Sequence, residues 1–406
     1  MRNLKVTFLH PDLGIGGAER LVVDAALALH NKGHKVHFLT THHDSSHCFK
    51  ETKDGTLPVT VVGDWLPRSV FGRLYALCAY IRIIYAAFYL VLFSDFESDV
   101  VFCDQISACI PILHFKFKHV LFYCHFPDQL LSTPGSFLKT LYRLPINWIE
   151  EVTTGCADKI LVNSNFTRNV FKQTFKSLNQ QPDILHPSIN TESFDQDVSY
   201  DVNNLLATPI SDDFNVVLSI NRYERKKNLM LAISSYEKLK NYMSESSFNK
   251  TCLIVAGGYD TRVTENLEHF LELKEYAKQL NLTEKVHFLR SPSDTEKLTL
   301  LNRCNVLVYT PSNEHFGIVP LEAMYALKPV VAVNSGGPVE TISPGKTGFL
   351  CEPLPDDFSK SLSKILEDKS LQESMGKAGR ERFKKNFSFE AFTEKLNQVI
   401  VNLVDC

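Results

Sequence analysis

Two glutamates with seven residues between them flank a glycine-containing turn in the second half of the chain. Glu314 follows an apolar run that predicts a buried strand, and Glu322 lies in the helix predicted after it. Carboxylates accept hydrogen bonds from sugar hydroxyls, and the unpaired N–H groups of a helix N-terminus bind phosphate. Helix capping would explain one glutamate but not both. The pattern therefore predicts a site for a phosphate-linked sugar, completed by Phe316, Gly317 and Ile318 of the turn.

A basic turn at residues 221–228 follows the first strand predicted in the same half. Arg222 ends that strand and Lys227 begins the next helix, so both cations can point to one edge of a sheet. A departing diphosphate gains negative charge, which fixed Arg and Lys side chains can neutralise without a metal ion. A solvated basic turn would have the same composition. The glutamate motif at another strand end favours the diphosphate site.

Two more loops follow predicted strands in the first half of the chain. Gly16 and Gly17 lie in a glycine-rich turn, where the backbone can approach a substrate phosphate or sugar closely. A packing turn between strand and helix would also use glycine there. His125 follows the strand predicted at 119–124, and its position fits a substrate contact or a structural histidine equally well.

Apolar strands alternate with amphipathic helices in both halves. The first half predicts strands at 5–9, 35–40, 59–62, 99–103, 119–124 and 159–163, and the second at 215–220, 252–256, 286–289, 306–309, 330–333 and 348–351. This alternation predicts an α/β fold with two mostly parallel sheets, each covered on both faces. Ligands of such doubly wound sheets bind at the carboxyl ends of the strands, where all four motifs lie.

A polar segment at residues 190–213 separates the two patterns and predicts a linker. We expect Rossmann-like domains at 1–200 and 201–385 that face a crevice, with residues 386–406 crossing back to the first domain. At 406 residues, the chain is long enough for two cores.

Composition is that of a globular protein, with 44% hydrophobic and 22% charged residues. A net charge of -3 gives no general attraction to nucleic acid. The ten cysteines, several of them in apolar runs, predict buried thiols in a reducing compartment. Residues 1–20 show no secretory signal.

Together these motifs resemble the retaining GT-B glycosyltransferases that share a Glu-x7-Glu motif, and the similarity covers nearly the whole chain. Segments 335–341 and 345–350 also resemble that family. The finer pattern is similar to the dolichol-pathway mannosyltransferases that form α-1,3 and α-1,6 linkages in lipid-linked oligosaccharide assembly. It is found at residues 10–12, 16–20, 124–128 and 221–228.

That resemblance implies a mannosyltransferase with GDP-mannose as donor and mannosyl-chitobiosyl-diphosphodolichol as acceptor, at the cytosolic face of the endoplasmic reticulum membrane, in company with other enzymes of the assembly. It implies that Arg222 and Lys227 hold the donor diphosphate and that Gly16 lines it. It also implies that Glu322 holds the ribose, that Glu314 contacts the mannose and that His125 reaches the mannose from the other domain. The specificity for guanine rests on the resemblance alone.

No cofactor is expected. Asp195 and Asp197 have the spacing that many metal-dependent glycosyltransferases use to hold a cation, but no apolar strand precedes them, and a solvated acidic turn fits better. No histidine and cysteine cluster has zinc spacing. With no nucleophile identified, we expect departure and attack on the same face of the sugar, which retains the α configuration.

Other classes of protein share parts of the pattern. An NAD-dependent oxidoreductase would use the glycine turn but leave Glu314 and Lys227 without a role. A related hexosyltransferase with another lipid or oligosaccharide acceptor, or a catalytically silent protein that binds sugar nucleotides, would keep the fold. Release of GDP from GDP-mannose only with a lipid acceptor separates the enzyme from the silent protein.

Residues 74–93 form an apolar stretch with Arg82 as its only charge, long enough to span a bilayer. Strands of one predicted sheet lie on both sides of it in the sequence, and a spanning helix would separate them. A helix packed on the sheet is one interpretation. We favour a helix in the membrane interface, with Arg68, Arg73 and Arg82 near lipid phosphates and residues 130–148 extending the surface.

Overall fold

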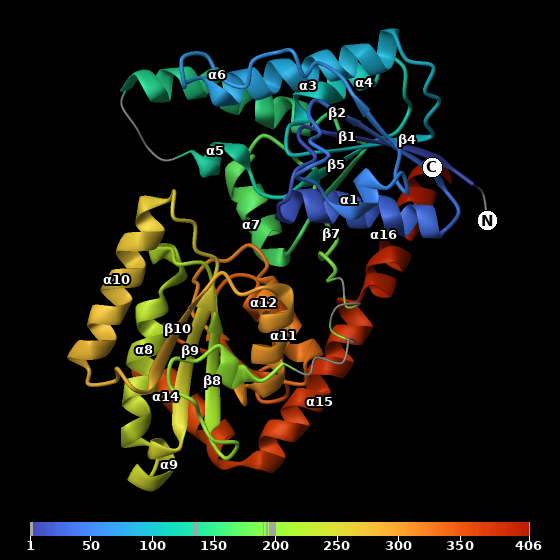
Figure 1. The fold of residues 1–406 in the computed structure, drawn as a ribbon. Coiled ribbons are helices and arrows are strands. Elements are labelled where there is room, and N and C mark those ends of the chain that lie inside the picture. Colours follow the sequence, from blue (N-terminus) through green and yellow to red (C-terminus); the bar gives the residue numbers. More distant parts are fainter. Residues whose placement is uncertain (1–2, 133–136, 190, 192–193, 195–199, 406) are drawn as a thin grey trace. The chain divides into compact units, whose positions relative to one another are not determined.

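The computed structural model describes residues 3–132, 137–189, 191, 194 and 200–405. The chain divides into two compact units (Figure 1): residues 1–188 with 389–406, called unit 1, and residues 189–388, called unit 2. The division precedes the boundary predicted at 200–201. The reason is that Ile189, directly before the polar segment, is already buried in the core of unit 2, and Phe194 of that segment packs against the same core.

Unit 1 contains one seven-stranded sheet in the order β3-β2-β1-β4-β5-β6-β7, and each neighbouring pair is parallel. Its strands are β1 (Lys5–His10), β2 (Lys35–Thr40), β3 (Val59–Val61), β4 (Val100–Asp104), β5 (Val120–Cys124), β6 (Lys159–Val162) and β7 (Asp183–Ile184). Its helices are α1 (Gly17–Asn31), α2 (Lys50–Lys53), α3 (Tyr75–Leu92), α4 (Ile110–Leu113), α5 (Asp128–Leu131), α6 (Phe137–Thr154), α7 (Asn165–Thr174) and α16 (Phe389–Asp405).

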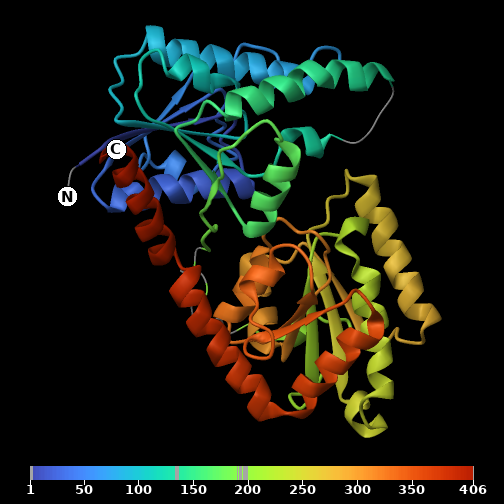
Figure 2. The same ribbon diagram turned by 180° about the vertical axis from the view of Figure 1, so that it is seen from behind.

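Both faces of this sheet are covered, because its strands are apolar on both sides. Leu9 and Val101 pack with α3, α4 and α6 in one core cluster. Phe8 and Phe102 pack with α1 and α16 in another, and their rings stack with centroids 4.8 Å apart. Figures 1 and 2 show α1 beside α16 on one side of the sheet and α3 beside α6 on the other.

Unit 2 contains a six-stranded sheet in the order β10-β9-β8-β11-β12-β13, again with parallel neighbours. Its strands are β8 (Asn215–Ile220), β9 (Thr251–Gly257), β10 (Val286–Arg290), β11 (Val306–Tyr309), β12 (Val330–Val333) and β13 (Gly348–Cys351). Its helices are α8 (Leu229–Lys238), α9 (Glu245–Asn249), α10 (Thr264–Gln279), α11 (Asp294–Arg303), α12 (Ile318–Tyr325), α13 (Pro338–Thr341), α14 (Pro355–Glu367) and α15 (Lys369–Asn386).

The same two-sided packing holds in unit 2. Helices α8, α10 and α14 cover one face, where Val217, Val255 and Val308 are buried. Helices α11, α12 and α15 cover the other, where Leu218 and Leu307 are buried. Both units are therefore doubly wound α/β structures, as the sequence predicts, and each has a point where the strand order reverses: β1 against β4 in unit 1, and β8 against β11 in unit 2.

Helix α3 covers the apolar stretch except for its two end residues, Leu74 and Phe93, and belongs to unit 1. By length and composition it is the one helix among the described residues that could cross a membrane, yet the strands before and after it pair in one sheet. Arg82 is 5% exposed, and its guanidinium donates to the Thr41 carbonyl at 2.6 Å and to Asp64 at 3.2 Å. The expectation that Arg82 lies near lipid phosphates is therefore wrong, because these partners hold the charge inside the unit.

Candidate active site

Lys227 and Glu314 meet at the carboxyl edge of the unit 2 sheet. Lys227 follows β8 and Glu314 follows β11, the two neighbouring strands where the order reverses. Lys227 Nζ donates a hydrogen bond to Glu314 Oε2 at 2.5 Å. Lys227 is only 9% exposed, and Thr310 Oγ1 donates to its backbone carbonyl at 2.8 Å. The pair is thus fixed where open α/β sheets bind their ligands.

Glycines hold the turn that carries Glu314. Gly317 precedes α12 with a φ of 82°, a left-handed conformation that favours glycine. Gly337 N donates to Glu314 O at 2.8 Å, and a Cβ on Gly337 would lie 1.9 Å from Phe316 O. The segment after β12 can therefore pack directly against the backbone of the Glu314 turn.

Glu322 lies in α12 and is 6% exposed. Lys297 Nζ donates to its Oε1 at 2.5 Å, whereas its Oε2 has no hydrogen-bonding partner in the described part of the chain. Burial, with the charges of Glu314 and Glu322, raises the pKa of Tyr309 well above its ordinary value, so this phenol stays protonated. A buried carboxylate oxygen without a donor is costly. A ligand hydroxyl at Glu322 would remove that cost.

The remaining predicted residues of unit 2 differ in what they can offer a ligand. Arg222 is exposed and pairs with Glu224 at 2.9 Å, so it is not part of the Lys227 pair. The Phe316 side chain is buried in the core, with its ring centroid 6.1 Å from that of Phe387. Phe316 can therefore meet a ligand only through its backbone. Ile318 is exposed at the start of α12.

Unit 1 places His125 in a chain of polar residues at the end of three neighbouring strands. His125 follows β5, and its Nε2 lies 2.7 Å from Asp104 Oδ2 at the end of β4. Asp104 Oδ1 lies 2.7 Å from Nδ1 of His10, the last residue of β1. The glycine turn is close to the same chain, because Glu19 folds back against Gly16 and reaches His10 at 3.9 Å. Gly17 begins α1.

A polar cavity of about 430 Å³ opens beside this chain in unit 1. It lies at the carboxyl ends of β1 and β2 and contains carboxylates, imidazoles and one guanidinium. Its lining residues are Asp12, Gly14, Ile15, Glu19, His42, Asp44, His47 and Arg68. Such groups are suited to a hydroxyl-rich ligand.

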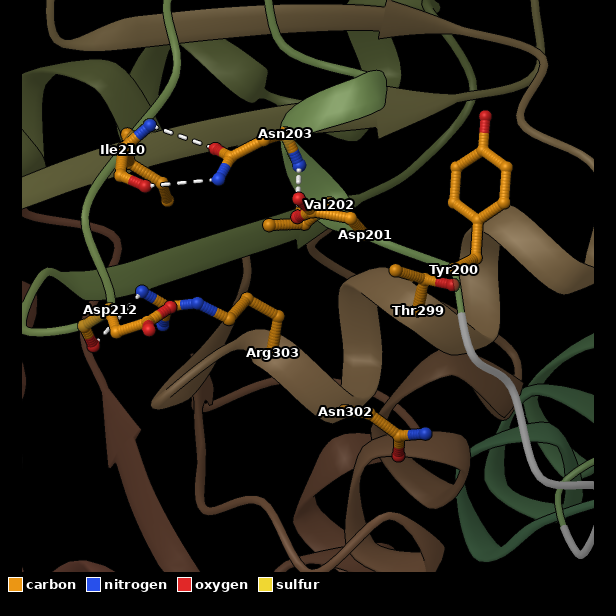
Figure 3. Close-up of a pocket in the computed structure, with 9 residues that line it drawn as sticks. All are labelled: Tyr200, Asp201, Val202, Asn203, Ile210, Asp212, Thr299, Asn302 and Arg303. Carbon is orange, nitrogen blue, oxygen red and sulfur yellow. Dashed lines mark hydrogen bonds between the residues drawn. The ribbon is translucent and has the colours of Figure 1, made fainter.

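A second cavity, of about 280 Å³, lies in unit 2 (Figure 3). Asn203 bonds both the N–H and the carbonyl of Ile210, and Arg303 donates to the carbonyl of Phe214, directly before β8. This cavity is therefore at the amino-terminal edge of the sheet, opposite the edge with Glu314. Its polar side chains are used to tie the segment before β8 to α11, so we do not assign it to the active site.

Within the described residues, no group of histidine, cysteine, aspartate and glutamate could hold a metal ion. The acidic pair Asp195 and Asp197 lies outside the described residues.

Sequence reasoning missed several charged partners of the predicted residues. Asp104 and Lys297 carry no motif of their own, and His10 was part of a family pattern without an assigned role. The role of each residue can be recognised only from its contact with a residue distant in the sequence. His10 and Asp104 are 94 positions apart, and Lys297 and Glu322 are 25 positions apart. The position of Asp104 at the end of an apolar run was the one available signal.

Family models match both halves of the chain: glycosyl transferases group 1 over residues 206–382, and glycosyltransferase family 4 over residues 15–193. Solved structures with a similar fold include sucrose-phosphate synthase from Thermosynechococcus elongatus, with a TM-score of 0.75 and 20% identity over 99% of this chain and 100% of that chain. A glycosyltransferase from Rickettsia africae has a TM-score of 0.73 and 17% identity over 99% of both chains. These likenesses show the fold, which is the GT-B type.

Relatives with much higher identity share one name. The alpha-1,3/1,6-mannosyltransferase ALG2 of Homo sapiens is 54% identical over 98% of this chain and 96% of its own length. The protein of that name from Dictyostelium discoideum is 47% identical over 99% of both chains, and that from Saccharomyces cerevisiae 40% identical over 98% of this chain and 85% of its own. Because this identity extends through both units, the chain is a glycosyltransferase and belongs to the alpha-1,3/1,6-mannosyltransferase family.

Proposed function

We propose that the protein transfers mannose from GDP-mannose to Man1GlcNAc2-diphosphodolichol, with retention of configuration, and forms α-1,3 and α-1,6 linkages. The observation that carries the proposal is the fixed pair of Lys227 and Glu314 at the strand-order reversal of unit 2, with the unpartnered Oε2 of Glu322 in the following helix. One cation and two carboxylates match a donor that joins a sugar to a ribose through a diphosphate.

Each group of the site has a separate role toward the donor. Lys227 neutralises the diphosphate. The exposed Arg222 side chain can also bind the diphosphate if its ion pair with Glu224 breaks. The backbone N–H groups of Gly317 and Ile318 at the start of α12 point to a phosphate. Glu322 accepts the ribose hydroxyls through Oε2.

The transferred mannose is held by Glu314, whose carboxylate already has one donor in Lys227 and can accept further hydrogen bonds from hydroxyls. From unit 1, His125 contacts the mannose, and Gly16 and Gly17 line the diphosphate, since glycine leaves room for a close approach of the backbone.

The transfer itself breaks the bond between mannose C1 and the β-phosphate oxygen and forms a bond from C1 to the acceptor oxygen on the same face. The bonding electrons leave with GDP, and the proton of the acceptor hydroxyl passes to the departing phosphate. The positive charge of Lys227 favours this step because the diphosphate becomes more negative as the bond breaks. No protein nucleophile takes part.

The acceptor is an amphiphile, and unit 1 offers a polar and an apolar surface for it. Its sugars would occupy the 430 Å³ cavity, where Asp44, His42 and Arg68 supply acceptors and donors. The apolar surface comprises the outward side chains of α3 and α6 with the residues directly before and after α3. These are Phe71, Leu74, Tyr75, Leu77, Ile81, Tyr85, Phe88, Leu92, Phe93, Phe137, Leu138, Leu141, Leu144 and Trp148.

We assign this apolar surface to the membrane interface. Phe71 is 99% exposed, which is costly for a phenyl ring in water but favourable among lipid headgroups and acyl chains. A hydrogen bond from Leu77 N to the Tyr142 hydroxyl at 2.9 Å joins the two helices, so their outer faces form one continuous surface. We place the protein at the cytosolic face of the endoplasmic reticulum membrane, where it would work beside other enzymes of lipid-linked oligosaccharide assembly.

Release of GDP by the purified protein tests the proposal. With GDP-mannose and a short-chain diphospholipid acceptor, GDP should appear in proportion to mannosylated product, and omission of the acceptor should abolish most of it. His125→Ala should stop the transfer and leave GDP affinity nearly unchanged. His114→Ala, on a histidine that bonds the Cys156 carbonyl, is the control. GDP binding without any acceptor-dependent release would assign the protein to the silent class.

A further inference from the structure

His10 and Asp104 are buried ionisable groups that the proposed reaction does not use directly. Both are 1% exposed, and Asp104 lies between two histidines, with 2.7 Å to Nδ1 of His10 and 2.7 Å to Nε2 of His125. Strand β4 lies between β1 and β5 in the sheet, so His10, Asp104 and His125 lie at the carboxyl ends of adjacent strands. A carboxylate this deeply buried is stable only with charged or donating partners.

The contacts of His10 limit where the protons can be. Its Nε2 lies 3.0 Å from the backbone carbonyl of Asp12, which can only accept, so Nε2 carries a hydrogen. Its Nδ1 faces Asp104, and one proton must lie between them. Either His10 is an imidazolium beside a carboxylate, or it is neutral beside a carboxylic acid.

The surrounding charges decide in favour of the imidazolium. The ionisable groups that face His10 are Asp104 of β4 and Glu19 of α1, with His125 beyond Asp104, while the Asp12 carboxylate turns to Arg68. Burial opposes the charge, but Asp104 and Glu19 together raise the pKa of His10 to about 10. Burial likewise disfavours the Asp104 anion, yet the charge of His10 lowers the pKa of Asp104 below its ordinary value.

We propose that His10 is a positioning residue that keeps Asp104 ionised, so that Asp104 fixes His125 with a proton on Nε2 and leaves Nδ1 as the acceptor for a sugar hydroxyl. Other contacts already fix the backbone and the ring position of His125. Asn163 Nδ2 donates to the His125 carbonyl at 3.0 Å, and the centroids of the Tyr123 and His125 rings are 4.8 Å apart. These two contacts do not determine the tautomer of the His125 imidazole, which Asp104 determines. The assignment of a sugar hydroxyl rests on the proposed function, whereas the charge of His10 does not.

The first test is spectroscopic and needs no activity. In the ¹⁵N-histidine-labelled full-length protein, long-range ¹⁵N–¹H spectra at pH 8 should show both ring nitrogens of His10 protonated, with the resonances assigned by their loss in His10→Gln. His125 should show a hydrogen on Nε2 only. A neutral His10 ring at pH 8 would overturn the proposal.

The second test separates positioning from folding by kinetics. Asp104→Asn can donate to His125 Nε2 and impose the wrong tautomer, so kcat should fall roughly hundredfold while GDP affinity is unchanged. His10→Gln should reduce kcat by roughly tenfold. It should also move the acid limb of the kcat profile up by about one pH unit or more, because Asp104 loses the cation that favours its ionised form.

Matched variants keep this kinetic test decisive. His37→Gln changes another histidine of the same sheet, which bonds Thr60 at 2.9 Å, and should keep the wild-type pH profile. If His10→Gln lowers kcat only in proportion to its folded fraction, with an unshifted profile, His10 is merely structural and the proposal fails. If His125→Ala transfers mannose normally while His10 is charged, the proposed role of His125 fails instead.

Discussion

At the scale of residues, the site consists of charges that are paired with one another. Lys227 and Glu314 neutralise each other at 2.5 Å, and Lys297 occupies one oxygen of Glu322. A sugar-nucleotide donor has two phosphates and several hydroxyls. These can bind to the same lysine and glutamate side chains without exposing them to water. Removal of one member of a buried pair leaves the other uncompensated, which is more costly than the pair is favourable.

Lys227→Ala should lower kcat by roughly a hundredfold or more and affect donor KM less, because the diphosphate is most negative in the transition state. Steady-state kinetics with varied GDP-mannose measure both constants. The adjacent Lys226, which is largely exposed and pairs with Glu224, provides the control, and Lys226→Ala should behave as wild type. Equal losses in the two variants would show that general basic charge, and not the Lys227 position, matters.

Glu322→Ala should have the opposite kinetic signature. A ribose contact exists in the bound donor and in the transition state alike, so a loss of about 1 to 3 kcal/mol should appear mainly in donor KM. Glu275→Ala on α10, where the glutamate is exposed, controls for a general change in charge. An unchanged donor KM would remove Glu322 from the ribose site.

At the scale of elements, the sequence predicts strands well because each is a short apolar run in a sheet buried on both faces. The shortest edge strand, β7, escaped prediction since two residues carry no periodicity. Helix α7 could be anticipated from its cap, Ser164, whose hydroxyl accepts from Thr167 N. The burial of Arg82 could not be predicted from the sequence, because Thr41 and Asp64 become its partners only when β2 and α3 pack together.

The same limit applies to the site. The motif glutamates and Lys227 could be named from strand ends and spacing, but their pairing across 87 residues depends on β8 lying beside β11. Phe316 is predicted as part of the donor site because it lies in the turn, but the spacing of a turn does not determine which way its aromatic ring points, and the ring is in the core.

Gly337→Ala tests how the Glu314 turn is held. The added methyl group would lie 1.9 Å from the Phe316 carbonyl oxygen, and because this oxygen belongs to the backbone, the turn must shift. We expect a lower Tm and a loss of transfer together, measured by thermal unfolding and by product formation. Gly17→Ala, whose Cβ would meet nothing within 4 Å, should leave the Tm unchanged. A Gly337→Ala protein with wild-type Tm and activity would contradict the tight packing.

At the scale of the whole molecule, the apolar surface of α3 and α6 is the feature that a water-soluble enzyme would not need. Helix α3 serves two environments, because its inner side chains such as Ile83 and Leu90 are buried in unit 1 while its outer ones are exposed. This division suits a helix that lies in the interface, and it explains how a stretch long enough to span a bilayer can remain part of a sheet domain.

Polar replacement of Leu77, Ile81 and Phe88 should release the protein from liposomes and lower activity on a long-chain lipid acceptor more than on a short-chain analogue. Flotation and parallel assays with both acceptors measure this. Leu271→Ser, on an exposed leucine of α10 in unit 2, is the control. Tags at the two ends of α3 found on opposite faces of the membrane would refute the interfacial helix.

Linkage analysis of the product tests the central claim most directly. The single purified protein is incubated with GDP-mannose and a short-chain diphosphate-linked mannosyl-chitobiose, and the released glycan is analysed for linkage position and anomeric configuration. The account predicts two added mannoses, one α-1,3 and one α-1,6, both from GDP-mannose. A β-linked product, or transfer from another nucleotide sugar in preference to GDP-mannose, would contradict it.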